Sequence, residues 1–315
     1  MIINGVRARI PAPKLPRSRT DPVASAEFIN RAFKQIKGRF KGIEFEVISL
    51  FESLPVSQRT TNAVSADEFN WIYDVDAARL AMTNERLMEI MDKWLLDGYQ
   101  LNILWSGQIV EDAYARGTAL AQSNLAAMSA TYATERSLSA ILMTPSYRRR
   151  VGIAYARTYE DWKGLSDKAR ADLAGIISEA VAAGRNPKTV VKTISERLGV
   201  SRSAAENIAQ TEITGALRQA RWDEADIAKK ELGLETSLLW ISALIPTTRR
   251  THAANHNKVL STEYVRQFYS VDGNRYRCLC SQTEVILMNG KPEIPQKVRD
   301  ALAKEKADWL ERHDA

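Results

Sequence analysis

The apolar pattern of the chain changes near Gly233, and this change does most to limit the possible folds. Over residues 84–233, apolar side chains recur every three to four positions, as they do along amphipathic helices. Residues 237–244, SLLWISAL, form a short apolar and aromatic run instead, which is typical of a buried strand. We therefore predict an α+β protein that is predominantly α-helical over its N-terminal two-thirds, with a small α+β domain at the C-terminus.

Prolines, glycines and capping residues divide this helical part. Pro145 ends one helical run, and Pro187 suits the first position of a later helix, where a missing N–H costs nothing. Gly199 is expected to stop that later helix. Ser203 and Glu206 match a capping box, which is expected to open another helix. The pattern thus predicts two separate helices on either side of position 200.

Shorter elements follow the apolar strand. We expect a helix over 262–268, a loop through 271–274, a strand over 284–288 closed by Asn289 and Gly290, and a last helix beginning at Pro295. Earlier in the chain, residues 42–53 alternate apolar and polar side chains before an apolar run. That alternation indicates a strand or a docking segment.

The first 42 residues are strongly basic. They hold ten Lys or Arg against two acidic residues, and because the whole chain has a net charge of +6, the rest is close to neutral. A basic arm containing proline presents charge to nucleic acid or to an acidic protein surface, although it can equally be a solubilising tail. The candidate binding residues are Arg7, Arg9, Lys14, Arg17 and Arg19. The predicted domains are this arm (1–42), a helical domain (43–200) and a C-terminal domain (201–315).

Several protein classes find no support in the sequence. No stretch of about eighteen apolar residues is present and the N-terminus lacks an apolar signal core, so we expect neither a membrane span nor secretion. The two cysteines, spaced C-x-C, cannot form a relaxed disulfide with each other, which favours a reducing compartment. The chain also lacks the glycine-rich and nucleophile motifs of phosphoryl transfer, dinucleotide binding and esterases.

Two of the three histidines and both cysteines lie within thirty residues of one another, which suggests a metal site. If the chain after Arg250 is helical, His252 and His256 share one face. Thiolates of Cys278 and Cys280 would complete a tetrahedral set of two nitrogens and two sulfurs, which favours zinc. Four protein ligands leave no open position, so such a zinc ion would be structural. The alternative is that the histidines bond to backbone or carboxylate and the cysteines are small buried apolar residues.

Thr211 and Glu212 lie in the predicted helix before Gly233. Such a pair is often exposed on the surface. Alternatively, Glu212 is turned inward and forms an ion pair with Arg249 or Arg250, bracing the helix against the following loop. A buried carboxylate of this kind needs an oppositely charged partner, because an unpaired buried charge destabilises the fold.

Four segments occur in an order that resembles a known family. They are IAQTEITGALRQARWDEA, a strand carrying Trp240, TTRRTHAANHNKV, and RYRCLCS. Over about residues 195–290 this order resembles the C-terminal domain of the Mu F-like minor head proteins, also called phage head morphogenesis proteins. The residues that match the family pattern are Thr211, Glu212, Arg249, His252, His256, Cys278 and Cys280. Gln210 stands where the family usually has arginine, and Ile245 and Pro246 stand where an aspartate is expected.

The resemblance implies a structural rather than catalytic protein. It implies a low-copy head component of a tailed phage, taken up during procapsid assembly in the host cytoplasm and kept in the virion. The implied partners are the portal protein, the major capsid or scaffold protein, and packaged double-stranded DNA. Two alternatives remain at this point: an enzyme of toxin or transferase type that carries a minor-head-like domain, and a zinc-stapled nucleic-acid-binding protein.

Overall fold

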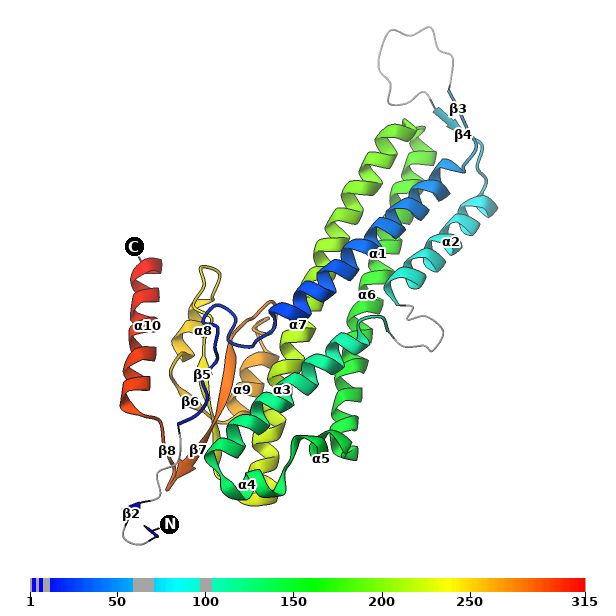
Figure 1. Ribbon diagram of the computed structural model, residues 1–315. Helices are drawn as coiled ribbons and strands as arrows, with labels where there is room; N and C mark the ends of the chain where they lie inside the picture. Colours follow the sequence, from blue (N-terminus) through cyan, green and yellow to red (C-terminus); the bar gives the residue numbers. More distant parts are fainter. Residues whose placement is uncertain (1, 4–5, 8–11, 59–70, 97–103, 315) are drawn as a thin grey trace. The chain divides into compact units, whose positions relative to one another are not determined.

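The computed structural model describes residues 2–3, 6–7, 12–58, 71–96 and 104–314. Helices make up most of this chain, and the largest sheet lies in its C-terminal part (Figure 1), which confirms the predicted α+β class. Among these residues, no helix is both long and apolar enough to cross a membrane.

The helices are α1 (Ala26–Glu52), α2 (Ala77–Leu95), α3 (Gly107–Met128), α4 (Ala130–Glu135), α5 (Leu138–Met143), α6 (Pro145–Ala183), α7 (Pro187–Leu232), α8 (Arg250–Asn255), α9 (Thr262–Ser270) and α10 (Gln296–Asp314). The strands are β1 (Ile2–Ile3), β2 (Val6–Arg7), β3 (Val56–Gln58), β4 (Trp71–Tyr73), β5 (Thr236–Ile241), β6 (Val259–Leu260), β7 (Ser281–Met288) and β8 (Lys291–Pro292).

The chain falls into two compact units, each made of separate segments. Unit 1 comprises residues 1–29, 108–155 and 210–315, and unit 2 comprises residues 30–107 and 156–209. Each unit draws residues from more than one of the predicted domains, and α1, α6 and α7 each contribute residues to both units.

Unit 2 is mainly helical, and its part of α1 corrects one expectation. Residues 42–52 are not a strand but the C-terminal part of α1, and Ser53 follows the helix. Ile43 and Val47 are fully buried while Phe45 is 73% exposed. Ile43 and Val47 are four residues apart, a spacing that lies on one face both of a strand and of a helix. The apolar positions in this segment therefore fit both the two-residue period of a strand and the period of a helix. The wider spacing of the buried residues Ile36, Phe40 and Ile43 fits only the helix.

α7 is a single helix of 46 residues, so the predicted interruption near position 200 is wrong. Gly199 and Ser203 both lie in its interior. A glycine within a helix costs only about 1 kcal/mol, and packing along both halves of α7 outweighs that cost. Other boundary signals are confirmed: α6 ends before Gly184 and α7 ends before Gly233, and both glycines have positive φ.

Unit 1 is built around a four-stranded antiparallel sheet in the order β6-β5-β7-β8. The central strands β5 (yellow) and β7 (orange) run side by side in Figure 1. Leu239 and Ile241 of β5 face α10 and pack with Leu302. Leu238 and Trp240, on the opposite face, pack against α7 and α9. Both faces of the sheet are covered, which explains the continuous apolar run in β5.

The other predicted elements of this region are present. α9 and α10 form where the pattern placed them, β5 ends at Ile241 although the apolar run continues to residue 244, and β7 begins slightly earlier than expected. Asn289 and Gly290 have φ values of 52° and 75° and connect β7 to β8, as in a two-residue hairpin turn.

The segment of residues 12–25, part of the predicted basic arm, lies along unit 1. The Lys14 backbone N–H donates to Asn124 Oδ1 (2.7 Å), and the Lys14 ammonium donates to Ser123 Oγ (2.8 Å). Asp21 accepts from the backbone N–H of Ser25 and of Ala26, at the start of α1. Of the expected arm, residues 12–25 are thus a docked segment and residues 26–42 belong to α1.

A buried ion pair lies at the centre of unit 1. Glu284 of β7 and Arg221 of α7 are joined by two charge-assisted hydrogen bonds of 2.8 and 2.7 Å. Asn124 of α3 donates to the same carboxylate at 2.8 Å. Because Asn124 also accepts from Lys14, one side chain links the sheet, α3 and the N-terminal segment.

Candidate metal centre

Three buried side chains of unit 1 bring metal-binding atoms together. His252 Nδ1 lies 3.3 Å from Cys278 Sγ and 3.7 Å from Cys280 Sγ, and all three donor atoms lie within 4.8 Å of one another. A tetrahedral zinc ion with Zn–S of about 2.3 Å and Zn–N of about 2.0 Å holds such atoms about 3.5 Å apart. The spacing therefore fits three ligands of one ion.

Local backbone geometry places the two sulfurs. Arg277 has a φ of 50°, in the left-handed region, and turns the chain directly before Cys278. The Cys280 N–H then lies 3.4 Å from Cys278 Sγ, in position to donate to it. This is the tight turn that a C-x-C pair needs if both sulfurs are to point the same way.

The His252 ring is oriented by a second hydrogen bond. Its Nε2 lies 3.2 Å from Asn274 Oδ1, and Asn274 Nδ2 donates to the Phe268 carbonyl (2.9 Å). The second bond leaves the Asn274 oxygen facing His252, and Arg249 Nη1 lies 3.3 Å from the same ring nitrogen. With a metal ion bound at Nδ1, the proton would be on Nε2 and would be donated to Asn274. Metal-binding histidines usually have this kind of partner on the other nitrogen.

A buried arginine favours thiolate at the cluster. Burial raises the pKa of Cys278, but hydrogen bonds from Cys280 and His252 and the charge of Arg218 outweigh it and hold that pKa well below its usual range. The hydrogen bond to Cys278 and burial raise the pKa of Cys280. Arg218 is 1% exposed, donates to the Cys278 carbonyl (2.7 Å) and lies over the Tyr269 ring. Its charge compensates for negative charge on the sulfurs.

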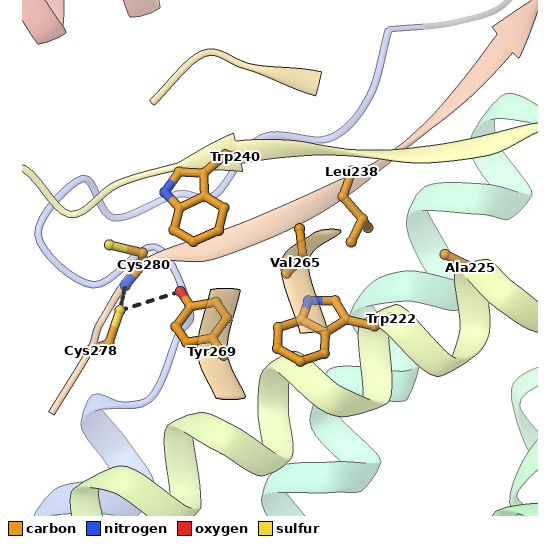
Figure 2. Close-up of a cluster of buried hydrophobic side chains, with 8 residues drawn as sticks. All are labelled: Trp222, Ala225, Leu238, Trp240, Val265, Tyr269, Cys278 and Cys280. Carbon is orange, nitrogen blue, oxygen red and sulfur yellow. Dashed lines mark hydrogen bonds between the residues drawn. The ribbon is translucent and has the colours of Figure 1, made fainter. Parts of the chain in front are cut away.

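Aromatic rings close one side of the cluster, as Figure 2 shows. Trp240 stacks on Tyr269 with 5.4 Å between ring centroids, and Trp222 stacks on the same tyrosine. The Tyr269 hydroxyl lies 3.3 Å from Cys278 Sγ. These rings exclude water from that side, so the sulfurs are not solvated there.

The family match covers the cluster. Residues 171–283 match the family model described as Phage Mu protein F like protein. This segment is Mu F-like. It begins earlier than the predicted region, within α6, and includes His252, Cys278 and Cys280. No curated protein matches the chain, and no solved structure does.

In the Mu F-like segment, His256 lies apart from the other three predicted ligands. α8 ends at Asn255, so the helix does not carry His256 onto the face of His252. His256 Nδ1 accepts from the Ser242 N–H (3.0 Å), and its Nε2 lies 3.9 Å from the Glu305 carboxylate. Burial lowers its pKa to about 4, so it is neutral. Bonding to backbone was the alternative reading for these histidines, and it describes His256.

The Mu F-like segment also gives Glu212 a partner other than Arg249. Glu212 is 1% exposed and is turned inward, and its carboxylate lies 3.8 Å from Arg275. Arg249 donates instead to the carbonyls of Asn274 (3.3 Å) and Tyr276 (2.7 Å). The arginine therefore braces the loop that positions His252.

Two residues that sequence reasoning missed support the Mu F-like cluster. Arg218 lies seven positions after Thr211, two turns along the same face of α7, so its inward position was readable from helical spacing. Asn274 gave no comparable signal, because its position depends on how the loop after α9 folds.

The basic candidates lie outside the Mu F-like segment. Arg7 is in β2, but its side chain, like the whole of Arg9, falls outside the described residues. Lys14 bonds to α3, Arg17 is exposed, and Arg19 forms an exposed ion pair with Glu305 (2.6 Å).

Proposed function

We propose that this chain is a minor head protein of a tailed bacteriophage that acts in head assembly rather than in catalysis. The observation that carries the proposal is the Mu F-like match over residues 171–283. The protein would be taken up from the host cytoplasm into the procapsid and remain in the virion, in the head interior or at the portal vertex. Its partners would be the portal protein and the major capsid or scaffold protein.

Contact with packaged double-stranded DNA is part of this proposal. α1 carries exposed lysines at three- to four-residue spacing, Lys34, Lys37 and Lys41, which form a basic stripe along the helix. Arg17 is also exposed. Cationic side chains on such a stripe gain free energy by releasing counterions from the phosphate backbone.

Zinc is the metal we propose for the cluster. Two sulfurs and one imidazole nitrogen suit zinc better than harder cations, and the distances fit its bond lengths. The ion would hold α8 to the loop before β7 and so stabilise the C-terminal fold. Elemental analysis of the purified chain should find about one zinc per polypeptide.

Mass spectrometry of purified capsids tests the assembly role. The polypeptide should be present in procapsids and mature heads at a copy number far below that of the major capsid protein. Its absence from both particles, in cells that produce the protein, would overturn the proposal.

A further inference from the structure

A pocket of about 370 Å³ opens beside the metal cluster within unit 1. His252, Cys278 and Cys280 form part of its lining, although each is at most 5% exposed. These three residues therefore form a buried part of the pocket wall, which a small group entering from solvent could reach. The opposite side of the cluster is closed by Trp240 and Tyr269.

The cluster supplies fewer ligands than zinc takes. Zinc is bound by four donors in most protein sites, and sites with three protein ligands keep the fourth position for water or another ligand. Among the residues that the structure describes, the grouped donors here are His252, Cys278 and Cys280. His256, the expected fourth ligand, is engaged with Ser242 instead. The fourth donor must therefore come from the pocket or from Tyr269.

The charge of the pocket indicates the kind of ligand. Arg249 and Arg277 both line it, together with Gln210 and Thr248, and its described lining includes no aspartate or glutamate. Arginines hold carboxylates through charge-assisted hydrogen bonds, and carboxylate oxygen is an ordinary zinc ligand. A carboxylate would therefore be attracted into the pocket and matched by both the metal and the arginines.

We propose that this metal centre takes a carboxylate, entering through the pocket, as its fourth ligand. The inference rests on the zinc proposal and extends it: the centre is open, and it binds either a small carboxylate or an acidic group of a neighbouring head protein. A pocket of this size suits a single small group, because ligand pockets begin at about 300 Å³.

Cobalt substitution of the full chain provides the test. Cobalt(II) in a tetrahedral sulfur and nitrogen site has visible bands that respond to a change of ligand. Acetate should shift the bands of the wild-type chain and saturate. In Arg277→Gln the apparent affinity for acetate should fall about tenfold, which corresponds to about 1.4 kcal/mol. Arg312→Gln on α10 removes the same charge away from the pocket and should leave that affinity unchanged.

A second variant tests whether the fourth ligand comes from the pocket or from the Tyr269 hydroxyl. Because the Tyr269 hydroxyl also lies 3.3 Å from Cys278 Sγ, the deciding readout is the acetate response rather than the position of the bands. If the hydroxyl is not a ligand, the wild type and Tyr269→Phe should bind acetate with similar apparent affinity. Acetate binding that appears only in Tyr269→Phe would show that the hydroxyl fills the fourth position in the wild type, and would overturn the proposal.

The same samples separate the two ligand sources. A carboxylate released on denaturing the purified zinc form, and identified by mass spectrometry, indicates a small molecule. No released carboxylate, together with a spectral response to acetate, indicates an acidic group from a partner protein.

The two proposals fail in different ways. A chain that binds neither zinc nor cobalt refutes both. A chain that binds one metal ion, releases no carboxylate and shows bands that acetate does not change refutes the open position alone.

Discussion

Cys278 is the residue on which the zinc proposal depends most directly. Cys278→Ser removes one of two sulfur donors with little change in volume. Zinc content should therefore fall from about one ion per chain to a small fraction of that, as measured by elemental mass spectrometry. The control is His256→Gln, another buried change, which should keep its zinc because His256 bonds to Ser242. Equal zinc loss in both variants would contradict the three-ligand assignment.

His256 should make stability depend on pH in a defined window. Burial lowers its folded pKa to about 4, whereas an unfolded imidazole titrates near 6.5. Below about pH 6.5 the His256 imidazole binds a proton in the unfolded chain but not in the folded chain. The free energy of unfolding therefore falls as the pH drops towards 4. The loss is at most about 3 kcal/mol. The facing charged groups are Glu305 and Lys306, and they act in opposite directions on the protonated ring.

Urea unfolding at a series of pH values measures this effect. The wild type and His256→Gln should differ most in their dependence on pH between about 6.5 and 4, because other titrating groups contribute to both. Parallel stability curves over that window would show that His256 does not carry the effect.

At the residue scale, it was easier to predict which side chains could bind a metal ion than which of them lie close together in the fold. His252, Cys278 and Cys280 were identified by their chemistry and their nearness in sequence, and the structure brings them together. His256 was included because four residues make one helical turn, but α8 ends one residue too early. Where a short helix stops depends on tertiary packing, which spacing alone does not reveal.

At the scale of elements, the unbroken α7 has a simple consequence for Gly199. A Cβ built on Gly199 meets no atom within 4 Å, and the residue lies inside the helix. Gly199→Ala should therefore raise the free energy of unfolding by about 0.5–1 kcal/mol. The contrast is Gly117 of α3, where a Cβ would lie 2.4 Å from the Leu217 carbonyl oxygen of α7.

Denaturant unfolding distinguishes the two glycines. Gly117→Ala should lower stability by about 1–3 kcal/mol, because α3 would have to move from α7. A destabilising Gly199→Ala would mean that α7 is interrupted near position 200, as the capping signals had indicated.

Most elements followed from local signals, and the failures share a cause. Pro187, Gly233 and the Asn289-Gly290 turn acted as boundaries because they set backbone angles directly. Gly199 and Ser203 did not, because their preferences cost little beside the packing of a long helix. The segment 42–53 was misassigned because its apolar positions fit both a strand and a helix.

At the scale of the molecule, unit 1 depends on the buried ion pair of Glu284 and Arg221. Glu284→Gln leaves a guanidinium buried without its counter-charge, which should cost about 3–5 kcal/mol of stability. Denaturant unfolding measures the loss. Glu311→Gln, at an exposed position on α10, should change stability by less than about 0.5 kcal/mol. A small effect at Glu284 would mean that solvent reaches the pair.

The proposed DNA binding depends on the basic stripe of α1. Replacing Lys34, Lys37 and Lys41 with glutamine should weaken binding and reduce the slope of log K against log salt by about 2.7, since each phosphate contact contributes about 0.9. Filter binding or fluorescence anisotropy at several salt concentrations measures the slope.

The control for the basic stripe is a variant that loses three positive charges at other exposed positions. The triple variant at Lys229, Lys230 and Lys304, all exposed, should retain the wild-type slope. If both triple variants lose affinity equally, the protein has a general attraction to polyanions and the stripe has no special part in it.

The discontinuity of unit 1 affects how a newly made chain matures. Asn124 bonds both to Lys14 and to Glu284, so the segment of residues 12–25 shares a partner with β7. Translation produces residues 12–25 first and β7 much later, and domains generally fold as whole units. Residues 12–25 therefore lack a complete surface to pack against until the ribosome has synthesised β7. Its docking therefore marks a polypeptide whose translation has passed that strand.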